Sequence, residues 1–264
     1  MKIRILELLE GARQARGTAV IIDVLRAFSL ECYLYAYGAE KVRPVGSVEE
    51  AFALREAHPG SLLVGERQGK MCEGFDFGNT PSGIPPEAVS GRLIFHTTSA
   101  GTQGILAASG ADRILTGSLV NARAVADYLL REQPEEVSLV CMGNGGIRRA
   151  EEDVLCAEYI RSLLLGNPLP DLAERIRRLP THGAEHFFRP ETQEIFPEAD
   201  FWLCMQADRF PFALEVRKDR EGFISVKREV PPAELSRTEG FPAVLSREGD
   251  SSAEEADAKE REAE

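Results

Sequence analysis

The chain has 264 residues, of which 43% are hydrophobic, and a formal net charge of −12. This length allows a sizeable core in one large domain or two small ones, and the acidity argues against a broad surface for nucleic acid or anionic membranes. Five cysteines without a C-x-x-C pair fit neither a disulfide framework nor a zinc ribbon. No apolar run is long enough to span a bilayer and no signal-peptide pattern is found, so a cytoplasmic protein is expected.

Short apolar runs rich in β-forming residues alternate along the chain with stretches of helical period. Strands are predicted over residues 3–8, 18–24, 41–45, 61–65, 92–97, 113–116, 137–142 and 201–205. Helices are predicted over residues 29–37, 48–57, 100–108, 121–132 and 151–165. Ser47 and Asn121 are the predicted N-caps of the second and fourth helices. This alternation is typical of an α/β fold in which a mostly parallel sheet carries helices on its faces.

The last third of the chain ends in a different pattern. FALEVRKDREGFISVKREV, residues 212–230, alternates apolar and polar positions on either side of the polar turn KDREG, which predicts a C-terminal β-hairpin. Beyond Pro231 large apolar residues become scarce, and residues 247–264 include eight acidic and three basic residues. We therefore predict one domain over residues 1–229 and an acidic, disordered tail over residues 230–264.

The first loop with candidate functional residues follows the strand AVII, where Asp23 and Arg26 come after four apolar residues. Ligands of open parallel sheets bind at the carboxyl ends of strands, so polar residues in this position are candidates for a site. A carboxylate there suits a hard cation, and a nearby arginine suits a phosphate or sulfonate. The alternative is a structural ion pair between Asp23 and Arg26 that caps the strand.

The second loop is glycine-rich and carries carboxylates. LLVGERQGKMCEGFDFGN places Glu66 and Arg67 after a predicted strand and Asp76 and Asn79 further on. Glycines let backbone amides approach an anion, while the carboxylates are suited to a metal ion. The alternative is a surface loop with ordinary turn chemistry.

The third loop, TTSAGT, joins a predicted strand to a predicted helix. Hydroxyls and free amides at a helix N-terminus form an anion site, which predicts phosphate binding by Thr97, Thr98, Ser99, Gly101 and Thr102. The segment lacks the G-K-[ST] ending of a Walker motif. The alternative is a well-capped helix without a ligand.

The fourth loop follows VSLVCM, where a glycine-rich turn leads to Glu152 and Asp153 at the start of a helix. Acidic residues in a first turn also stabilise the helix dipole, so a structural role is the alternative. GNGG lacks the third glycine of a dinucleotide fingerprint. His182 and His186 lie four residues apart, but a nearby proline and an intervening glycine argue against a helical zinc pair.

Six segments together resemble one known family. IDVLRA, GERQG, GFDFGNTP, TTSAGT, GSLVNARAVA and EDVLCA occur in an order and spacing similar to those of the 2-phosphosulfolactate phosphatases, and the resemblance covers about residues 1–227. It implies a three-layer α/β/α fold, a requirement for Mg²⁺, and hydrolysis of 2-phospho-3-sulfolactate to 3-sulfolactate and phosphate, a reaction of coenzyme M biosynthesis. The chain departs from the family in two loops, where Phe28, Ser29 and Leu30 replace a threonine run and TTSAGT replaces TTNGT. These departures bear on the substrate more than on the reaction class.

The resemblance also implies roles for individual residues. Catalytic roles fall to Asp23, Arg26, Arg67 and Glu152. Metal binding falls to Asp23, Glu66, Asp76 and Asp153. Substrate or phosphate binding falls to Asn79, Thr97, Thr98, Gly101, Thr102 and Asn121, with Ser99 added from its place among the hydroxyls. The metal and an arginine would stabilise phosphoryl charge while one carboxylate, not yet specified, orients or deprotonates the attacking water.

The expected partner is a small anionic phosphoester, with no nucleic acid and no membrane, and a homodimer is the default assembly. Two alternatives remain for the function. One is a phosphatase that acts on another small anionic phosphoester, and the other is a non-catalytic module that binds a phosphorylated metabolite. The excess of carboxylates favours an enzyme, since carboxylates repel an anionic ligand unless a cation intervenes.

Overall fold

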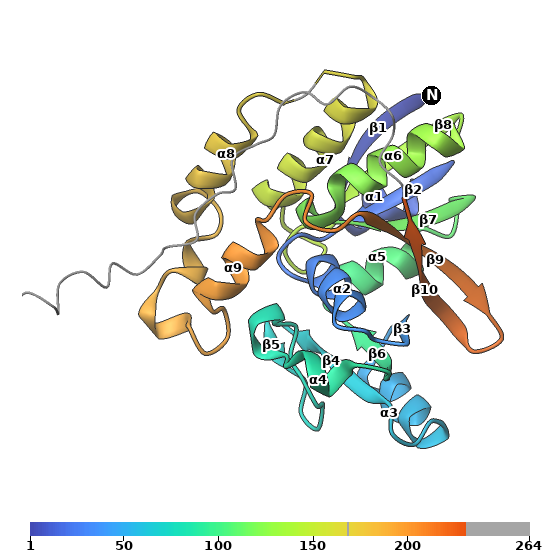
Figure 1. Cartoon of the computed structure of the whole chain (residues 1–264), viewed down its shortest axis with the longest axis vertical. Helices are drawn as coiled ribbons and strands as arrows, with labels where there is room; N and C mark the ends of the chain where they lie inside the picture. Colours follow the sequence, from blue (N-terminus) through green and yellow to red (C-terminus); the bar gives the residue numbers. More distant parts are fainter. Residues whose placement is uncertain (168, 231–264) are drawn as a thin grey trace, which may run out of the picture. The chain divides into compact units, whose positions relative to one another are not determined.

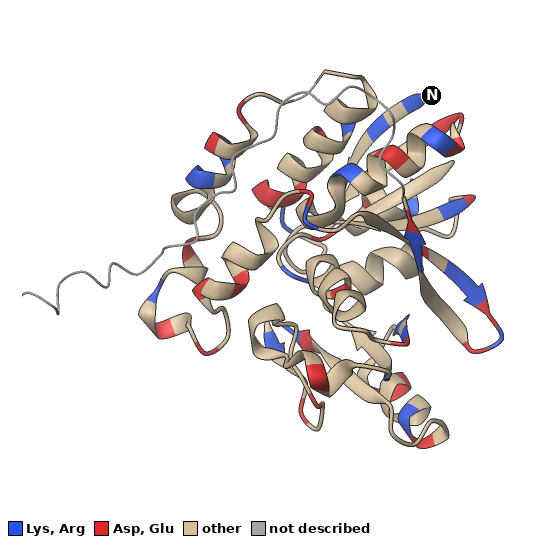
Figure 2. Cartoon of the chain, viewed as in Figure 1, with Lys and Arg blue, Asp and Glu red and all other residues tan. Residues whose placement is uncertain are grey.

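The structure is a computed structural model that describes residues 1–167 and 169–230. The predicted tail, apart from Val230, lies outside the described residues, so its disorder stays a prediction. Among the described helices, none combines the length and apolar character needed to cross a membrane. Lys, Arg, Asp and Glu are interspersed along the helices and the hairpin (Figure 2).

A sheet of ten strands forms the centre of the described chain (Figure 1). The strand order is β1-β8-β2-β7-β9-β10-β3-β6-β4-β5. The strands are β1 (Lys2–Glu7), β2 (Thr18–Ile22), β3 (Lys41–Pro44), β4 (Leu62–Arg67), β5 (Lys70–Met71), β6 (Leu93–Thr97), β7 (Arg113–Gly117), β8 (Glu136–Cys141), β9 (Phe212–Asp219) and β10 (Gly222–Glu229). The α/β fold class and the C-terminal hairpin are thereby confirmed.

The α-helices flank this sheet on both faces. They are α1 (Leu8–Arg13), α2 (Ala27–Ala36), α3 (Val48–Ala57), α4 (Pro86–Val89), α5 (Gly101–Ala107), α6 (Ala122–Glu132), α7 (Glu151–Leu164), α8 (Leu172–Arg178) and α9 (Glu198–Cys204). Short 3₁₀ turns include η1 (Pro81–Gly83), η2 (Leu119–Asn121), η4 (Glu185–Phe187) and η5 (Pro190–Thr192).

The hairpin divides the sheet into two parallel blocks. Strands β1, β8, β2 and β7 are parallel to one another, and so are β3, β6 and β4. The pairings β7–β9, β9–β10 and β10–β3 are all antiparallel, so the second block runs against the first. The hairpin predicted at the end of the chain therefore lies in the middle of the sheet, where it joins the two blocks.

The core has the three layers expected for an α/β/α fold. Strand β2 is buried along its whole length because its side chains face helices on both sides. Val20 and Ile22 pack in one cluster with α6 and α7, whereas Ala19 and Ile21 pack in another with α1 and α5. Alternate residues of a strand point to opposite faces, so one apolar run fills both layers.

Two predictions of local structure were wrong. Residues 201–205 were predicted as a strand, but Phe201–Cys204 belong to α9, where Phe201 and Cys204 are buried on one helix face. Asn121 occupies the N-cap position of α6 without capping it, because its Oδ1 accepts from the Ser118 backbone N–H at 3.0 Å. The Ser47 cap is confirmed, since its hydroxyl accepts from the backbone N–H of Glu50 at 3.1 Å.

One buried carboxyl group lies away from the strand ends, on α2. Glu31 is fully buried, and its Oε2 accepts from Thr116 Oγ1 at 3.3 Å. Its Oε1 has no hydrogen-bond partner among the described residues. Burial raises the pKa of Glu31 from 4.5 to about 7, against smaller opposing effects of the Ser225 and Thr116 hydroxyls.

We predict that Glu31→Gln stabilises the protein at pH 8 but not at pH 4. Between pH 4.5 and about 7 only the unfolded chain loses the Glu31 proton, so wild-type stability falls as the pH rises. The amide has no such penalty, and the gain above pH 7 is expected to reach about 2 to 3 kcal/mol. Urea unfolding at both pH values measures it, with the exposed Glu56→Gln as control. A gain that does not change with pH would contradict this explanation.

Candidate active site

Two connections between the parallel blocks meet at the carboxyl ends of β2 and β6. The chain leaves β2 at Asp23 and crosses to β3 through α2, and it leaves β6 at Thr98 and crosses back to β7 through α5. The start of α5 lies directly against Asp23, because a Cβ added to Gly101 would be 2.9 Å from Asp23 Oδ2. Only glycine allows so close an approach, which explains this residue better than a role in phosphate binding.

Asp23 is buried at this crossing point. Its Oδ1 accepts a hydrogen bond from the Ala27 backbone N–H at 3.1 Å. Burial raises the pKa of Asp23 to about 8, and repulsion by Asp153 and then Glu66 adds to the effect, whereas nearby backbone amides oppose it. Asp23 therefore lies among other carboxyl groups with little solvent to separate their charges.

Asp153 and Glu152 approach Asp23 from the first turn of α7. Asp153 Oδ1 accepts from the Val24 N–H at 2.8 Å and Oδ2 from the Gly143 N–H at 2.7 Å, so this side chain joins the loops after β2 and β8. Glu152 is 7% exposed, and its Oε2 has no partner within the described chain. Burial raises the pKa of Asp153 to about 8 and that of Glu152 to about 7, with repulsion from neighbouring carboxylates.

Glu66 holds the loop after β6 rather than presenting free oxygens. Its Oε1 accepts from the Ser99 N–H at 2.7 Å. Its Oε2 accepts from the Ser99 hydroxyl at 3.0 Å and from the Gly69 N–H at 2.7 Å. Ser99 thus binds a carboxylate in this structure, and its predicted contact with phosphate stays a prediction.

The predicted phosphate cradle is a helix cap in the structure. Thr98 N–H donates to Thr102 Oγ1 at 2.9 Å, and Thr102 N–H donates to Thr98 Oγ1 at 3.1 Å. Both threonines are buried, and the two hydroxyls satisfy amides at the start of α5. The alternative of a well-capped helix describes this segment. Thr97 instead receives a hydrogen bond from Arg67 Nη2 at 2.9 Å.

Arg26 is buried and forms an ion pair in this structure. Its Nη1 donates to Asp200 Oδ2 at 2.6 Å and to the Ile195 carbonyl at 2.9 Å. Its Nη2 donates to the Gly69 carbonyl at 3.3 Å, and the guanidinium carbon lies 5.7 Å from the ring centroid of Phe187 and 5.2 Å from that of Phe196. The alternative prediction for Arg26 was an ion pair with Asp23. The structure shows an ion pair, but its partner is Asp200.

Arg67 differs from Arg26 in having no carboxylate within ion-pair distance among the described residues. Its Nη1 donates to the carbonyl of Glu66 at 2.7 Å, next to the bond to Thr97. Of the two arginines predicted to act in catalysis, Arg67 is the one whose charge is not neutralised by an ion pair.

The other predicted residues are dispersed around this centre. Asp76 forms an ion pair with Arg55 of α3, and its Oδ2 accepts from the Leu63 N–H at 2.8 Å, so it does not join the other carboxylates. Asn79 is buried and lines a cleft beside Arg26. Asn121 is buried in η2, where its side chain bonds to the backbone of Ser118.

The structure does not assemble the four predicted metal ligands into one group. Within residues 1–167 and 169–230, no three His, Cys, Asp or Glu side chains are placed to hold a metal ion together. A divalent cation nevertheless fits part of the donor set, since Glu152 has an unpaired buried oxygen and Asp23 is repelled by its neighbours. Mg²⁺ is usually bound through one or two carboxylates plus waters and substrate phosphate, and Asp23 and Glu152 match that number.

Sequence reasoning missed Asp200, which is fully buried and central to the arrangement. Its Oδ2 pairs with Arg26 and its Oδ1 accepts from the Ser82 N–H at 2.8 Å. The signal available was its position within residues 1–227, which the family resemblance covers, but around it only residues 201–205 were interpreted, as a strand. Gly69 was also missed, although its N–H and its carbonyl bind Glu66 and Arg26, respectively.

Comparisons with known proteins agree with the resemblance. The family described as 2-phosphosulpholactate phosphatase matches residues 3–217. A probable 2-phosphosulfolactate phosphatase of Caldicellulosiruptor saccharolyticus is 33% identical over 216 residues, which cover 75% of this chain and 88% of the relative. Proteins with the same description from Carboxydothermus hydrogenoformans and Bacillus subtilis are 38% and 27% identical over 177 and 204 residues. These alignments cover 66% and 76% of this chain and 72% and 88% of the relatives.

We predict that breaking the Arg26–Asp200 pair destabilises the protein strongly. Arg26→Met or Asp200→Leu leaves one buried charge without its partner, which costs roughly 3 to 5 kcal/mol. The double variant loses both charges and is expected to be more stable than the sum of the single changes implies. Urea unfolding of all three variants provides the measurement.

The exposed pair Arg178–Glu174 on α8 is the matched control for this cycle. Its removal is expected to change the free energy of unfolding by less than about 1 kcal/mol. Single variants at Arg26 and Asp200 that behave like this control would show that the buried pair has no special structural role.

Proposed function

The chain belongs to the 2-phosphosulfolactate phosphatase family, and we propose that it hydrolyses 2-phospho-3-sulfolactate to 3-sulfolactate and phosphate. The observation that carries the proposal is the group of buried carboxyl groups of Asp23, Glu152 and Asp153, in which Glu152 Oε2 is unpaired within the described chain. Carboxyl groups with strongly shifted pKa values cluster at functional sites. A phosphatase has a use for them, since hydrolysis needs both a cation site and a proton acceptor.

We further propose Mg²⁺ as the cofactor, with Asp23 and Glu152 as the residues that would hold it. When bound, the ion would offset negative charge on the phosphoryl oxygens and ease the approach of the anionic ester. Asp153 positions this site, because its two oxygens are bonded to the backbone after β2 and β8. Glu66 does the same for the loops that contain Gly69 and Ser99.

Side chains of the protein carry the remaining roles, which are phosphoryl binding, activation of water and structural support. Arg67 binds a phosphoryl oxygen, supported by the absence of an ion-pair partner in the described part of the chain. One of the two carboxylates, Asp23 or Glu152, orients or deprotonates the attacking water. Arg26 acts through structure, because it is held by Asp200 and two carbonyl groups.

A cytoplasmic location is part of the proposal. It is supported by the five cysteine thiols, all of which are buried and free, as is common in a reducing compartment. The homodimer expected by default stays a prediction.

The decisive measurement is phosphate release from 2-phospho-3-sulfolactate, phospholactate, phosphoglycolate and an aryl phosphate, each with Mg²⁺ or with EDTA. Preferential, EDTA-sensitive turnover of phosphosulfolactate is expected. Turnover of a different ester would keep the reaction class and change the assigned substrate. No turnover of any ester would favour the binding-module alternative.

We predict that Asp23→Asn and Glu152→Gln each lower kcat by about a hundredfold or more, as expected for loss of a group that acts on the reacting atoms. Asp76→Asn is the matched control, since Asp76 pairs with Arg55 outside the carboxylate group, and its kcat is expected to stay within about threefold of wild type. Circular dichroism checks that each variant is folded. A loss in Asp76→Asn as large as in Asp23→Asn would return Asp76 to the metal site.

A further inference from the structure

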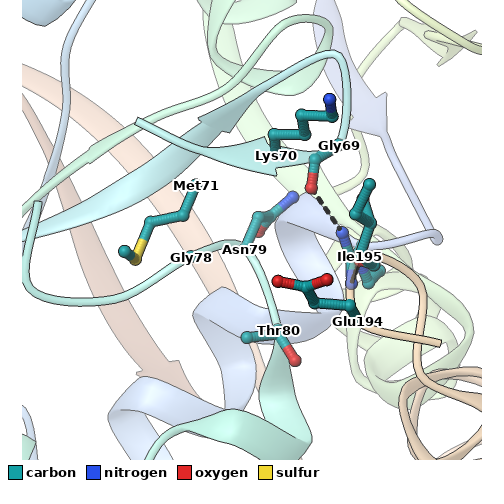
Figure 3. Close-up of a pocket in the computed structure, with 9 residues that line it drawn as sticks. Gly69, Lys70, Met71, Gly78, Asn79, Thr80, Glu194 and Ile195 are labelled. Carbon is teal, nitrogen blue, oxygen red and sulfur yellow. Dashed lines mark hydrogen bonds between the residues drawn. The ribbon is translucent and has the colours of Figure 1, made fainter. Parts of the chain in front are cut away.

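Two loops adjoin the buried carboxyl groups of the candidate site, and they differ in how firmly they are held. The β4–β5 turn contains Gly69 and forms one wall of a cleft of about 480 Å³ (Figure 3). Its Gly69 carbonyl is bonded to the buried Arg26–Asp200 pair. The loop from β8 to α7, residues 142–150, has only exposed ion pairs within the described chain. Exposed pairs contribute little, so this second loop is the more easily displaced of the two.

Gly143 joins the second loop to the carboxyl groups, because its N–H donates to Asp153 Oδ2 at 2.7 Å. A tight turn follows at once. The Asn144 N–H donates to the Arg148 carbonyl at 2.7 Å, and the Arg148 N–H donates to the Asn144 carbonyl at 3.2 Å. A Cβ on Gly143 would lie 2.2 Å from the Arg148 carbonyl oxygen, so the turn can close only on glycine. Residues 144–148 therefore form a compact turn that begins one residue from a bond to a buried carboxylate.

The turn carries two side chains that are unusually free. Ile147 is 76% exposed, the largest exposed fraction among the large apolar side chains that the structure describes. Arg148 is also exposed, and its guanidinium forms no ion pair and no hydrogen bond within the described chain. The adjacent Arg149 is bound to Glu7 at 2.6 Å and to Glu151 at 3.2 Å. One apolar group and one cation that is not neutralised thus lie side by side next to the carboxyl groups.

Both groups suit a segment that closes over a charged substrate. An isoleucine side chain gains free energy when it is buried, and exclusion of water strengthens the electrostatic interactions inside a site. A guanidinium without an ion pair can bind an acidic group without first losing a partner. The buried carboxyl groups repel an anionic ester, and a cation brought close to the ester offsets part of that repulsion.

We propose that residues 144–148 are a lid that closes over the bound substrate, with Ile147 covering the site and Arg148 bound to an acidic group of the substrate. The inference rests on the proposed function for the identity of the substrate. Arg148 gains a partner only when an anion is bound, so the substrate favours the closed position over the one seen here. Arg149 stays bound to Glu7 and anchors the loop behind the lid.

The test is cleavage by trypsin after Arg148 and Arg149, followed by mass spectrometry with and without Mg²⁺ and both products, 3-sulfolactate and phosphate. The products are expected to slow cleavage at this loop about tenfold, since closure buries Ile147. Ile147→Ser and Arg148→Met are each expected to lose most of this protection, and Arg148→Lys, which keeps the charge, to retain part of it. Cleavage after Lys218 and Arg220, at the β9–β10 turn, is the internal reference and should not change.

Arg220→Met is the matched control variant, since Arg220 is likewise exposed in a turn and forms no ion pair within the described chain. Its loop at residues 144–148 should be protected as in the wild type. Equal cleavage with and without the products, equal slowing at both turns, or full protection in Ile147→Ser and Arg148→Met would each overturn the lid.

Protection from trypsin does not require turnover, so failure of the lid and failure of the proposed function are distinguishable. A wild type that the products protect in the expected pattern but that releases no phosphate keeps the lid and loses the reaction. A wild type that turns over the ester without protection of the loop keeps the reaction and loses the lid.

Discussion

Three carboxyl groups, those of Asp23, Glu152 and Asp153, are buried close to one another where the two parallel blocks of the sheet exchange chain connections. Burial disfavours their ionised forms, and mutual repulsion disfavours ionising them together. Backbone amides offset part of this cost at Asp153 and Asp23. Glu152 keeps an unpaired oxygen among the described residues. A bound cation would therefore offset the repulsion between these carboxylates more than another hydrogen bond within the protein would.

The surrounding structure separates residues that hold the site from residues with free chemical groups. Asp153, Glu66 and the Thr98–Thr102 pair use their oxygens on backbone amides, and so fix where the loops lie. Arg26 is bound by Asp200, while Arg67 is not neutralised in this way. A buried ion pair is costly to break, so Arg26 suits a structural role and Arg67 suits an incoming anion.

The sequence predicted the longer strands and helices in the first two thirds of the chain because each buried strand is a short apolar run between helical patterns, but it missed the short elements α1, β5 and α4. It failed at residues 201–205, where five apolar residues in a row fit a strand as well as a short helix. The roles of individual side chains were harder to predict from the sequence. Thr98 and Thr102 have the same spacing in a cap and in an anion site, and only the direction of their hydroxyls distinguishes the two. The partner of Arg26 lies 174 residues away, so no local pattern could identify it.

Segments between residues 195 and 229 support a site whose reactive groups come earlier in the sequence. The β9–β10 hairpin joins the two parallel blocks, so the crossing connections that place Asp23 beside Gly101 depend on strands formed by residues 212–229. Asp200 and Ile195 reach the same centre through Arg26. These late residues add no carboxylate to the buried group, yet they fix the loops that contain it and form one wall of the adjoining cleft. Because Arg26 binds the carbonyl of Gly69, and the N–H of Gly69 binds Glu66, one buried arginine links the cleft wall to the loop that Glu66 holds.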